Sequence, residues 1–525
     1  MKQGMTGQQL KRLILVAITL VMVALLGTSL LGSLGEPQVN DRLQLYQTDL
    51  ALRALEFVNS PDSTESGEDF TAARNALLGE KPLETALKQY QTVRTSAEAN
   101  LDKFQAQLQT ANGANETSLT VPTEPSSAPE DMSRLGTAIQ QQQELVNQLD
   151  LRIGILEAEQ NNVSAAQATW TGILDRNSTA ESNLAKTANV LLGLWSEPPR
   201  LVPDAEPVLK NLDGWFRYRS LSRLYELQQR SDSLAALQAA EQQFAQRTIV
   251  KLALVNVIPV IGGTVGLVLL IVTAVRKLFQ KDTAEAENLA WSVPWEWDTI
   301  LQVIVLGFFF IGQIILPFFL QAAGFNFSGL GSQAKAAYTL TYYLLMASGG
   351  LAVLYFSVKP FFPLPEDWFQ LIGKRNWFAW GLGGYLAALP LMIGVAVINQ
   401  QIWQGQGGSN PLLQTVLEEG DRVAIGMFFF TAAVAAPVFE EVLFRGFLLP
   451  SLTRYVPVWG AIGVSALLFA LAHLSLSEVL PLAVLGAVLG YIYTRSRGLL
   501  APILLHSLWN SATMVGLLVL GSGAR

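Results

Sequence analysis

The sequence predicts an all-α polytopic membrane protein: a bundle of about nine transmembrane helices with an N-terminal α-helical domain outside the membrane. Only 15% of its 525 residues are charged, 50% are hydrophobic, and the mean hydropathy is +0.32. Soluble domains carry about 25% charged residues, so this deficit indicates lipid as the solvent for much of the chain. Uncharged runs long enough to cross a bilayer recur through the second half.

Net charge and rare residue types exclude several classes of function. The net charge of −7 excludes a nucleic-acid partner as the expected ligand. The absence of cysteine excludes disulfides, thiolate catalysis and cysteine-ligated metals. The two histidines, His473 and His506, both lie in the apolar C-terminal region, where they become candidate functional residues.

The first apolar run, residues 13–34, contains no charged residue and follows Lys11 and Arg12. As a helix it is roughly 33 Å long, enough to cross a hydrocarbon core of about 30 Å. The apolar core of a cleavable signal peptide is shorter, about 7–15 residues. Residues 1–35 are therefore predicted to be an uncleaved membrane anchor.

Residues 36–247 form a polar region rich in Gln, Ala, Leu and Glu, which we expect to be a separate helical domain. Apolar residues recur in it at helical spacing, as at Leu83, Leu87, Tyr90 and Val93. The Pro-, Ser- and Thr-rich stretch 110–134 is predicted to be a flexible linker within the domain.

Two segments of this domain, 156–170 and 224–238, share one pattern: a helical start, a polar turn and then Ala-rich small residues. The pattern weakly resembles the helical hairpins of tetratricopeptide repeats, which commonly bind peptides and proteins. An antiparallel helical bundle is the alternative interpretation. The domain is accordingly a candidate site for a protein partner.

The rest of the chain divides into transmembrane helices in 248–370 and a C-terminal core in 371–525. Trp291, Trp295 and Trp297 precede the third span and are typical of an interfacial aromatic belt. The expected spans after the anchor are 252–275, 299–322, 336–357, 379–399, 423–449, 458–474, 479–494 and 499–520.

The positive-inside rule orients these spans. With the N-terminus in the cytoplasm, the short external segments carry only Lys335, Arg422 and Arg525. The region 36–247 then lies outside the cytoplasm. The cytoplasmic segments carry Lys2, Lys11, Arg12, Arg276, Lys277, Lys281, Lys359, Lys374, Arg375, Arg454, Arg495 and Arg497.

Ionisable residues cluster in the last spans, where a charge costs about 2.5–3.5 kcal/mol on the insertion scale and marks function by default. In the string PVFEEVLFRGFLLP, Glu441 and Arg445 are four residues apart on one helical face and form a natural ion pair. Glu440 lies on another face without a partner. An unpaired carboxylate in an apolar site suits a general base or acid.

The other polar groups come from two further spans. His506 and Asn510 share a helical face, and Phe469 lies one turn before His473, where its ring could fix the imidazole. An Asn and a His facing a carboxylate can stabilise an oxyanion. Taken singly, each feature has a structural explanation, such as an ion pair or an interhelical hydrogen bond. Their gathering in about 70 residues favours a catalytic site.

These residues form three strings, EEVLFR (440–445), FALAH (469–473) and HSLWN (506–510), which resemble the three motifs of the CPBP family. That family comprises the CAAX proteases and bacteriocin-processing enzymes, also called Abi, and includes the type II CAAX prenyl endopeptidase. The resemblance covers about residues 420–520. It implies an intramembrane endopeptidase that hydrolyses peptide bonds of a peptide or membrane-protein substrate with activated water.

Carried over to this chain, the resemblance implies Glu440 as the catalytic glutamate and His473 as its helper in activating water. It implies His506 and Asn510 as the oxyanion-stabilising pair, with Glu441 and Arg445 in support. A Zn²⁺ ion held by Glu440, His473 and His506 and a metal-free glutamate mechanism both remain open. A non-catalytic membrane adaptor or chaperone of the same fold, assembling membrane protein complexes, and a transporter are the alternatives.

Overall fold

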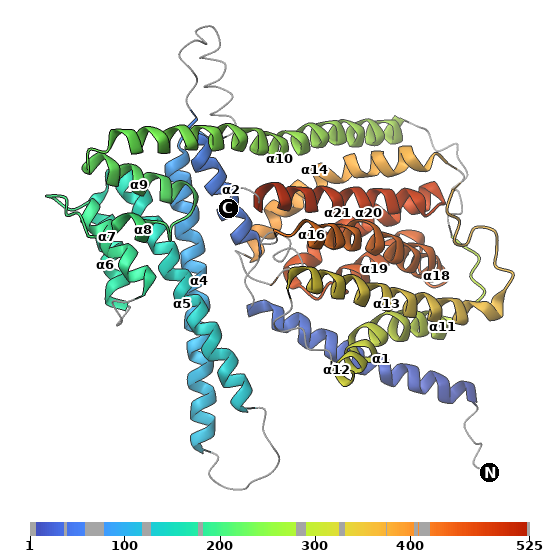
Figure 1. Ribbon diagram of the computed structural model, residues 1–525. Helices are drawn as coiled ribbons and strands as arrows, with labels where there is room; N and C mark the ends of the chain where they lie inside the picture. The colour runs from blue at the N-terminus through green and yellow to red at the C-terminus, as the bar shows by residue number, and fades with distance from the viewer. Residues whose placement is uncertain are drawn as a thin grey trace. The chain divides into compact units, whose positions relative to one another are not determined.

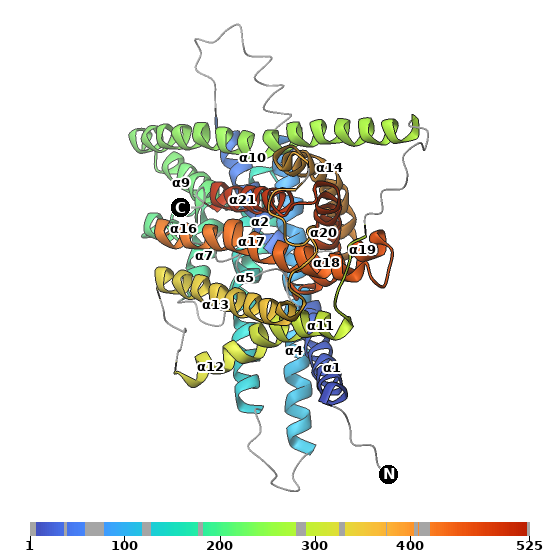
Figure 2. The same cartoon turned by 90° about the vertical axis from the view of Figure 1, so that its right-hand side faces the viewer.

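The computed structural model describes residues 7–35, 39–57, 78–117, 128–176, 182–279, 290–324, 331–373, 375–403, 408 and 420–521. These residues form helices and contain no strand, which confirms the predicted all-α class (Figures 1 and 2). The chain divides into unit 1, Met1–Val39 with Val257–Leu518, and unit 2, Asn40–Asn256 with Val519–Arg525. The division falls inside one long helix, α10 (Ser231–Phe279).

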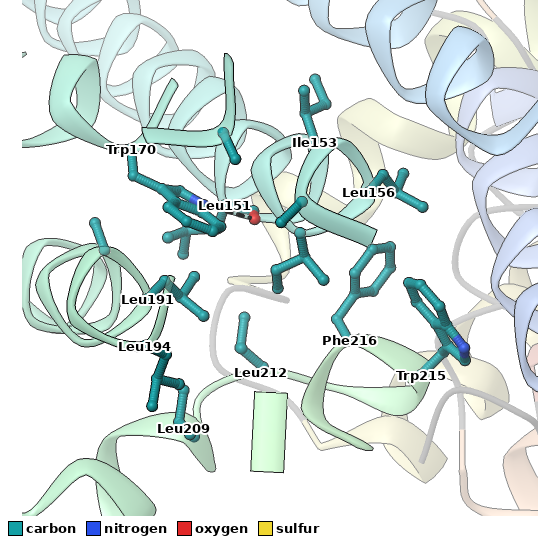
Figure 3. Close-up of a cluster of buried hydrophobic side chains, with 14 of the residues drawn as sticks. Leu151, Ile153, Leu156, Trp170, Leu191, Leu194, Leu209, Leu212, Trp215 and Phe216 are labelled. Carbon is teal, nitrogen blue, oxygen red and sulfur yellow. Dashed lines mark hydrogen bonds between the residues drawn. The ribbon is translucent and has the colours of Figure 1, made fainter. Parts of the chain in front are cut away.

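Unit 2 is an array of helices packed around an apolar core (Figure 3). Trp170 lies against Gly154, where an added Cβ would approach its ring nitrogen to 2.3 Å, so the two helices meet closely because this position is glycine. The indole N–H donates to the Leu151 carbonyl at 3.2 Å. The helices are α2 (Val39–Leu55), α4 (Pro82–Thr117), α5 (Ala128–Glu159), α6 (Val163–Arg176), α7 (Asn183–Leu194), α8 (Ala205–Leu209), α9 (Gly214–Leu227) and the first part of α10.

The two segments singled out for their shared pattern are both helix–turn–helix units with the same turn. Asn161 and Gln229, 68 residues apart, take left-handed backbone conformations with φ of 63° and 54°. In each turn the next amide donates to a carbonyl five residues back, at 2.9 Å. A separation of 68 residues is twice the 34-residue tetratricopeptide period. The segment between the two turns departs from the tetratricopeptide pattern, because its helix α8 has only five residues.

The predicted linker 110–134 is helical at both ends. Helix α4 continues to Thr117 and α5 begins at Ala128, and the two long helices pack against each other. Pairing with a partner helix overrides the weak helix propensity of this stretch. Residues 118–127 lie outside the described part.

Unit 1 contains most of the apolar helices. Eight helices in the described residues are long and apolar enough to cross a membrane, one fewer than predicted. The difference is the expected span 458–474, which is the shorter helix α19 (Val458–Leu471). The eight are Gly7–Gly32, Ser231–Arg276, Trp297–Ala322, Ser332–Phe361, Trp377–Trp403, Arg422–Leu452, Leu476–Ser496 and Leu500–Val519.

Contacts between connecting segments define two opposite ends of unit 1. At one end Lys11, near the start of α1 (Gly7–Gly32), pairs with Asp298 at 3.4 Å, and Arg454 donates to the Trp295 carbonyl at 2.7 Å. At the other end Ser33 accepts from the Leu476 amide at 3.1 Å. Helix α19 runs from the first end to the second, although its 14 residues are only about 21 Å long. Lys11 and Arg454, which the positive-inside count places on one side of the membrane, lie at the same end of unit 1. Which end faces the cytoplasm remains a prediction.

The tryptophans before the third span do not form a lipid-facing belt. Trp291 and Trp295 are buried inside the protein, and only Trp297 is exposed. Trp295 donates to the Ser451 hydroxyl at 2.9 Å, and Trp291 stacks on Tyr493. Their rings contact protein because residues 290–297 pack beside the end of the span 422–452, where the Trp291 amide donates to Thr453 and Arg454 donates to the Trp295 carbonyl.

Four helices of unit 1 position the candidate site. They are α13 (Ser332–Val358), α19, α21 (Leu500–Gly521) and the helical span 422–452, which runs through five consecutive elements. Helix α13 packs against the third span and against α16 (Arg422–Phe430), and α19 packs against α20 (Leu476–Ser496) (Figures 1 and 2). The five elements are α16 (Arg422–Phe430), η4 (Thr431–Ala435), α17 (Ala436–Glu440), η5 (Glu441–Leu448) and α18 (Leu449–Leu452).

Candidate active site

The helix that carries both glutamates has two wide turns with hydrogen bonds over five residues, in η4 and η5. Such π-type turns are often found at functional sites. In η4 the Ala436 backbone amide donates to the Thr431 carbonyl, five residues back. The next bond of this type would join residue 437 to the Ala432 carbonyl, but Pro437 has no N–H to donate. The Asn510 side-chain amide takes its place and donates to that carbonyl at 2.8 Å. Asn510 thus ties α21 to the glutamate helix.

Glu441 and Arg445 form the ion pair that their spacing predicts. Arg445 donates to Glu441 Oε1 at 2.7 Å, and both side chains are 0% exposed. The guanidinium also donates to the Gly486 carbonyl at 3.1 Å and lies 4.5 Å above the Phe469 ring. Partners on the following two helices therefore hold the arginine, as a buried charge requires.

The structure adds a third member to this pair. His506 Nδ1 lies 2.9 Å from Glu441 Oε1. A carboxylate accepts hydrogen bonds, so the tautomer of His506 that satisfies this contact has its proton on Nδ1. Its Nε2 then points toward Glu440, 4.0 Å from Oε2. The second glutamate of the motif consequently orients the imidazole toward the first.

The sequence suggested that Glu440 has no partner, but the structure gives it one. The Tyr343 hydroxyl of α13 donates to Glu440 Oε1 at 3.0 Å. The side chain of Glu440 is 14% exposed, against 0% for Glu441. Glu440 therefore keeps one oxygen bound to Tyr343 and the other close to His506. Separations of 4.0 Å are too long for a direct hydrogen bond and suit a bridging water.

His473 stands apart from these groups. Its Nδ1 lies 2.9 Å from the Phe469 carbonyl of its own helix end. Within the described part of the chain, no hydrogen bond or ion pair joins it to Glu440, His506 or Asn510. The Phe469 ring packs against both imidazoles, with centroids 5.0 Å from His473 and 5.7 Å from His506. Phe469 thus contacts His473 as expected and also His506, which was not expected.

A zinc ion bound by Glu440, His473 and His506 needs three donor atoms about 2.0–2.2 Å from one point. Among the described residues, no three His, Asp or Glu side chains gather in this way. His506 and Glu440 approach each other, whereas His473 bonds its own helix. The side chains as placed therefore do not fit a zinc ion with these three ligands.

Sequence reasoning missed two features of the site: Tyr343 and the contact between Glu441 and His506. Tyr343 lies in an apolar span without a motif, next to another tyrosine, so no signal in the sequence separated it from a packing residue. The second contact joins residues 65 positions apart. Its signal was present only in part: a buried carboxylate oxygen can accept a second hydrogen bond, and His506 shares Oε1 of Glu441 with Arg445.

Comparison with known proteins shows which family this part of the chain resembles. Residues 422–512 match the family model described as type II CAAX prenyl endopeptidase Rce1-like. The membrane-embedded CAAX protease MroQ of Staphylococcus aureus (strain USA300) is 23% identical over 226 residues, 42% of this chain and 88% of that protein. The protein of Bacillus subtilis (strain 168) named "Putative membrane peptidase YdiL" is 22% identical over 136 residues, 26% of this chain and 54% of that protein.

A third relative is an uncharacterized 24.3 kDa protein of Escherichia coli, 40% identical over 93 residues, 17% of this chain and 42% of that protein. No solved structure matches significantly. The chain therefore carries an Rce1-like CAAX protease domain at its C-terminal end, within a multi-pass membrane protein. A domain of this family implies a peptidase.

Proposed function

We propose that this protein is an intramembrane endopeptidase in which Glu440 is the general base. The observation that carries the proposal is the pair formed by Glu440 Oε2 and His506 Nε2, 4.0 Å apart, inside an apolar helical bundle. Two acceptors at this separation can hold one water between them. Positioned proton transfer of this kind contributes roughly 10²–10⁴-fold to rate.

In the proposed reaction, Glu440 takes a proton from the water while the water oxygen bonds to the carbonyl carbon of the substrate peptide. The carbonyl electrons move onto oxygen, and the C–N bond breaks when Glu440 returns the proton to the leaving amine. His506 accepts a hydrogen bond from the water when its imidazole is neutral. When the C–N bond has broken, Nε2 takes the remaining proton of the former water from the new carboxyl group, and the Glu441 carboxylate stabilises the charge on the imidazole.

Two residues of the motif set have less direct parts in this proposal. Asn510 uses one amide N–H on the Ala432 carbonyl and retains the other, so oxyanion stabilisation by Asn510 rests on that second N–H. His473 contacts Phe469 rather than Glu440, so its help in activating water requires its imidazole to turn from the helix end toward the water.

The test compares the purified full-length protein with Glu440→Gln and Glu440→Ala in detergent, assayed by mass spectrometry on a pool of membrane-derived and prenylated peptides. We expect wild-type products and a loss of about 10³-fold or more in both variants. The matched control is Glu206→Gln, which removes the charge of an exposed carboxylate paired with Arg230 in unit 2. A zinc chelator should leave the wild-type rate unchanged.

Two outcomes would change the proposal. If wild type and both variants behave alike while all remain folded, the membrane adaptor or chaperone becomes the better description. If the chelator abolishes cleavage and added zinc restores it, Glu440 and His506 become metal ligands in a rearranged site.

Unit 2 is proposed to recruit the substrate or a protein partner. Its described surface contains a cavity of about 340 Å³ between α4, α5 and α6, lined by charged and polar residues that include Gln91, Arg94, Thr169 and Arg176. Stacked helical hairpins commonly present such surfaces to peptides and proteins. A chain without 36–247 should still cleave the short peptides above but lose cleavage of native membrane substrates. Unchanged cleavage of those substrates would remove this role.

A further inference from the structure

Tyr343 lies outside residues 422–512, yet its side chain reaches the candidate base. Its hydroxyl donates to Glu440 Oε1 at 3.0 Å and has no other hydrogen-bond partner in the described residues. A hydroxyl that donates to a carboxylate fixes one oxygen and so determines where the other points. In this site the other oxygen points toward His506 Nε2.

The sequence of α13 explains why the tyrosine reaches so far. Tyr343, Ala347, Gly350 and Leu354 recur every three or four residues and form the face that α13 turns inward. A Cβ on Gly350 would come within 3.1 Å of the Phe439 ring and of the Gly307 carbonyl oxygen, so glycine at this position favours the close packing of α13 on the glutamate helix. Phe439 directly precedes Glu440, and the Tyr343 ring lies 6.2 Å from its ring, edge to face.

From these contacts we infer that Tyr343 is a positioning residue for Glu440, holding the carboxylate so that its free oxygen faces His506. The active site therefore extends onto a helix that precedes the matched domain. This inference rests on the proposed function of Glu440. It assigns Tyr343 no proton transfer, because the hydroxyl contacts only the carboxylate oxygen that faces away from His506.

The chain provides a matched control one residue away. Tyr342 also donates its hydroxyl within unit 1, but to the backbone carbonyl of Gly312 at 2.5 Å in the third span. Tyr343→Phe and Tyr342→Phe each remove one hydroxyl from the same turn of α13 and keep the ring. Only the first removes a hydrogen bond to the candidate base.

The first measurement is kcat and KM of full-length wild type and both variants on a peptide that wild type cleaves. We expect Tyr343→Phe to lower kcat roughly 10-fold or more with KM within about twofold, because alignment of the base matters most in the transition state. Tyr342→Phe should keep both constants within about twofold of wild type. Equal kinetics for the two variants, or a change confined to KM, would overturn the inference.

The second measurement does not depend on a substrate. Thermal unfolding in detergent is followed for Tyr343→Phe, Glu440→Ala and the double variant, with a parallel cycle that uses Tyr342→Phe. The Tyr343 substitution should lower Tm less in the Glu440→Ala background than in wild type, because its acceptor is already gone, whereas the Tyr342 cycle should be additive. Full additivity at Tyr343 would contradict the contact. Non-additivity without any peptide cleavage would instead refute the proposed function.

Discussion

Unit 1 and unit 2 each bury a carboxylate beneath two basic side chains, and the partners differ. In unit 2, Asp150 is 2% exposed and receives hydrogen bonds from Arg94 and Arg176, whose side chains are 29% and 42% exposed. In unit 1, Glu441 is 0% exposed and is shared by Arg445, also 0% exposed, and His506.

The difference lies in what each carboxylate can do. Both partners of Asp150 are arginines, which stay charged and reach water, so the arrangement ties α4, α5 and α6 together. One partner of Glu441 is an imidazole, whose second nitrogen is directed at another carboxylate. A buried charge network that ends in a titratable group aimed at Glu440 is typical of catalysis, whereas one that ends in solvent is typical of structure.

Breaking the network of unit 1 should have the largest effect. Glu441→Gln leaves the Arg445 charge buried without its carboxylate, which costs about 3–5 kcal/mol of the free energy of unfolding. It also removes the ionised acceptor of the His506 proton, and loss of such an orienting partner lowers activity roughly 10–100-fold or more. Thermal unfolding and peptide turnover of the purified variant measure the two losses.

A paired replacement separates stability from function at this position. In Glu441→Met with Arg445→Met, both charges are removed together, and apolar side chains of similar volume fill the space. Such replacements of buried ion pairs are often neutral or stabilising, so the double variant should recover most of the lost stability. It should not recover turnover, since His506 still lacks its acceptor. Recovery of both would make Glu441 a purely structural residue.

The sequence predicted the parts of this site that depend on spacing along one helix. Glu441 and Arg445 are four residues apart, and the wide turns of η5 leave them on one face. The apolar runs predicted the helices because length and hydropathy alone decide whether a segment suits a bilayer. Only α19 was too short, since its expected range ran into the polar turn that begins near His473.

What could not be predicted depends on which helices become neighbours. Tyr343 donates to Glu440 where Gly350 packs against the Phe439 ring, and Asn510 donates to the Ala432 carbonyl, which has no N–H of Pro437 to accept from. Each of these contacts joins residues 78 or more positions apart. The sequence of one helix predicted an unpaired Glu440, whereas in the structure Tyr343 of another helix donates to its carboxylate. Trp291 and Trp295 were likewise misread, because their partners come from distant segments.

Breaking the network of unit 2 should have a smaller effect and one confined to stability. In Asp150→Asn the side chain loses its charge but keeps one carbonyl oxygen that can accept from either Arg94 or Arg176. The released guanidinium can turn toward water, because both arginines are partly exposed, and Arg94 keeps its 2.8 Å pair with Glu98. We therefore expect a loss of about 1–2 kcal/mol, between the values for exposed and buried pairs.

Thermal unfolding of Asp150→Asn beside Glu441→Gln tests the comparison directly, because each variant changes one buried carboxylate to its amide. Turnover of short peptides should stay within about twofold of wild type for Asp150→Asn. If the variant instead lost short-peptide cleavage as strongly as Glu441→Gln while remaining folded, Asp150 would belong to the catalytic machinery. The two networks differ in the exposure of their basic side chains. A stability loss as large as that of Glu441→Gln would therefore show that the released arginine does not regain contact with water.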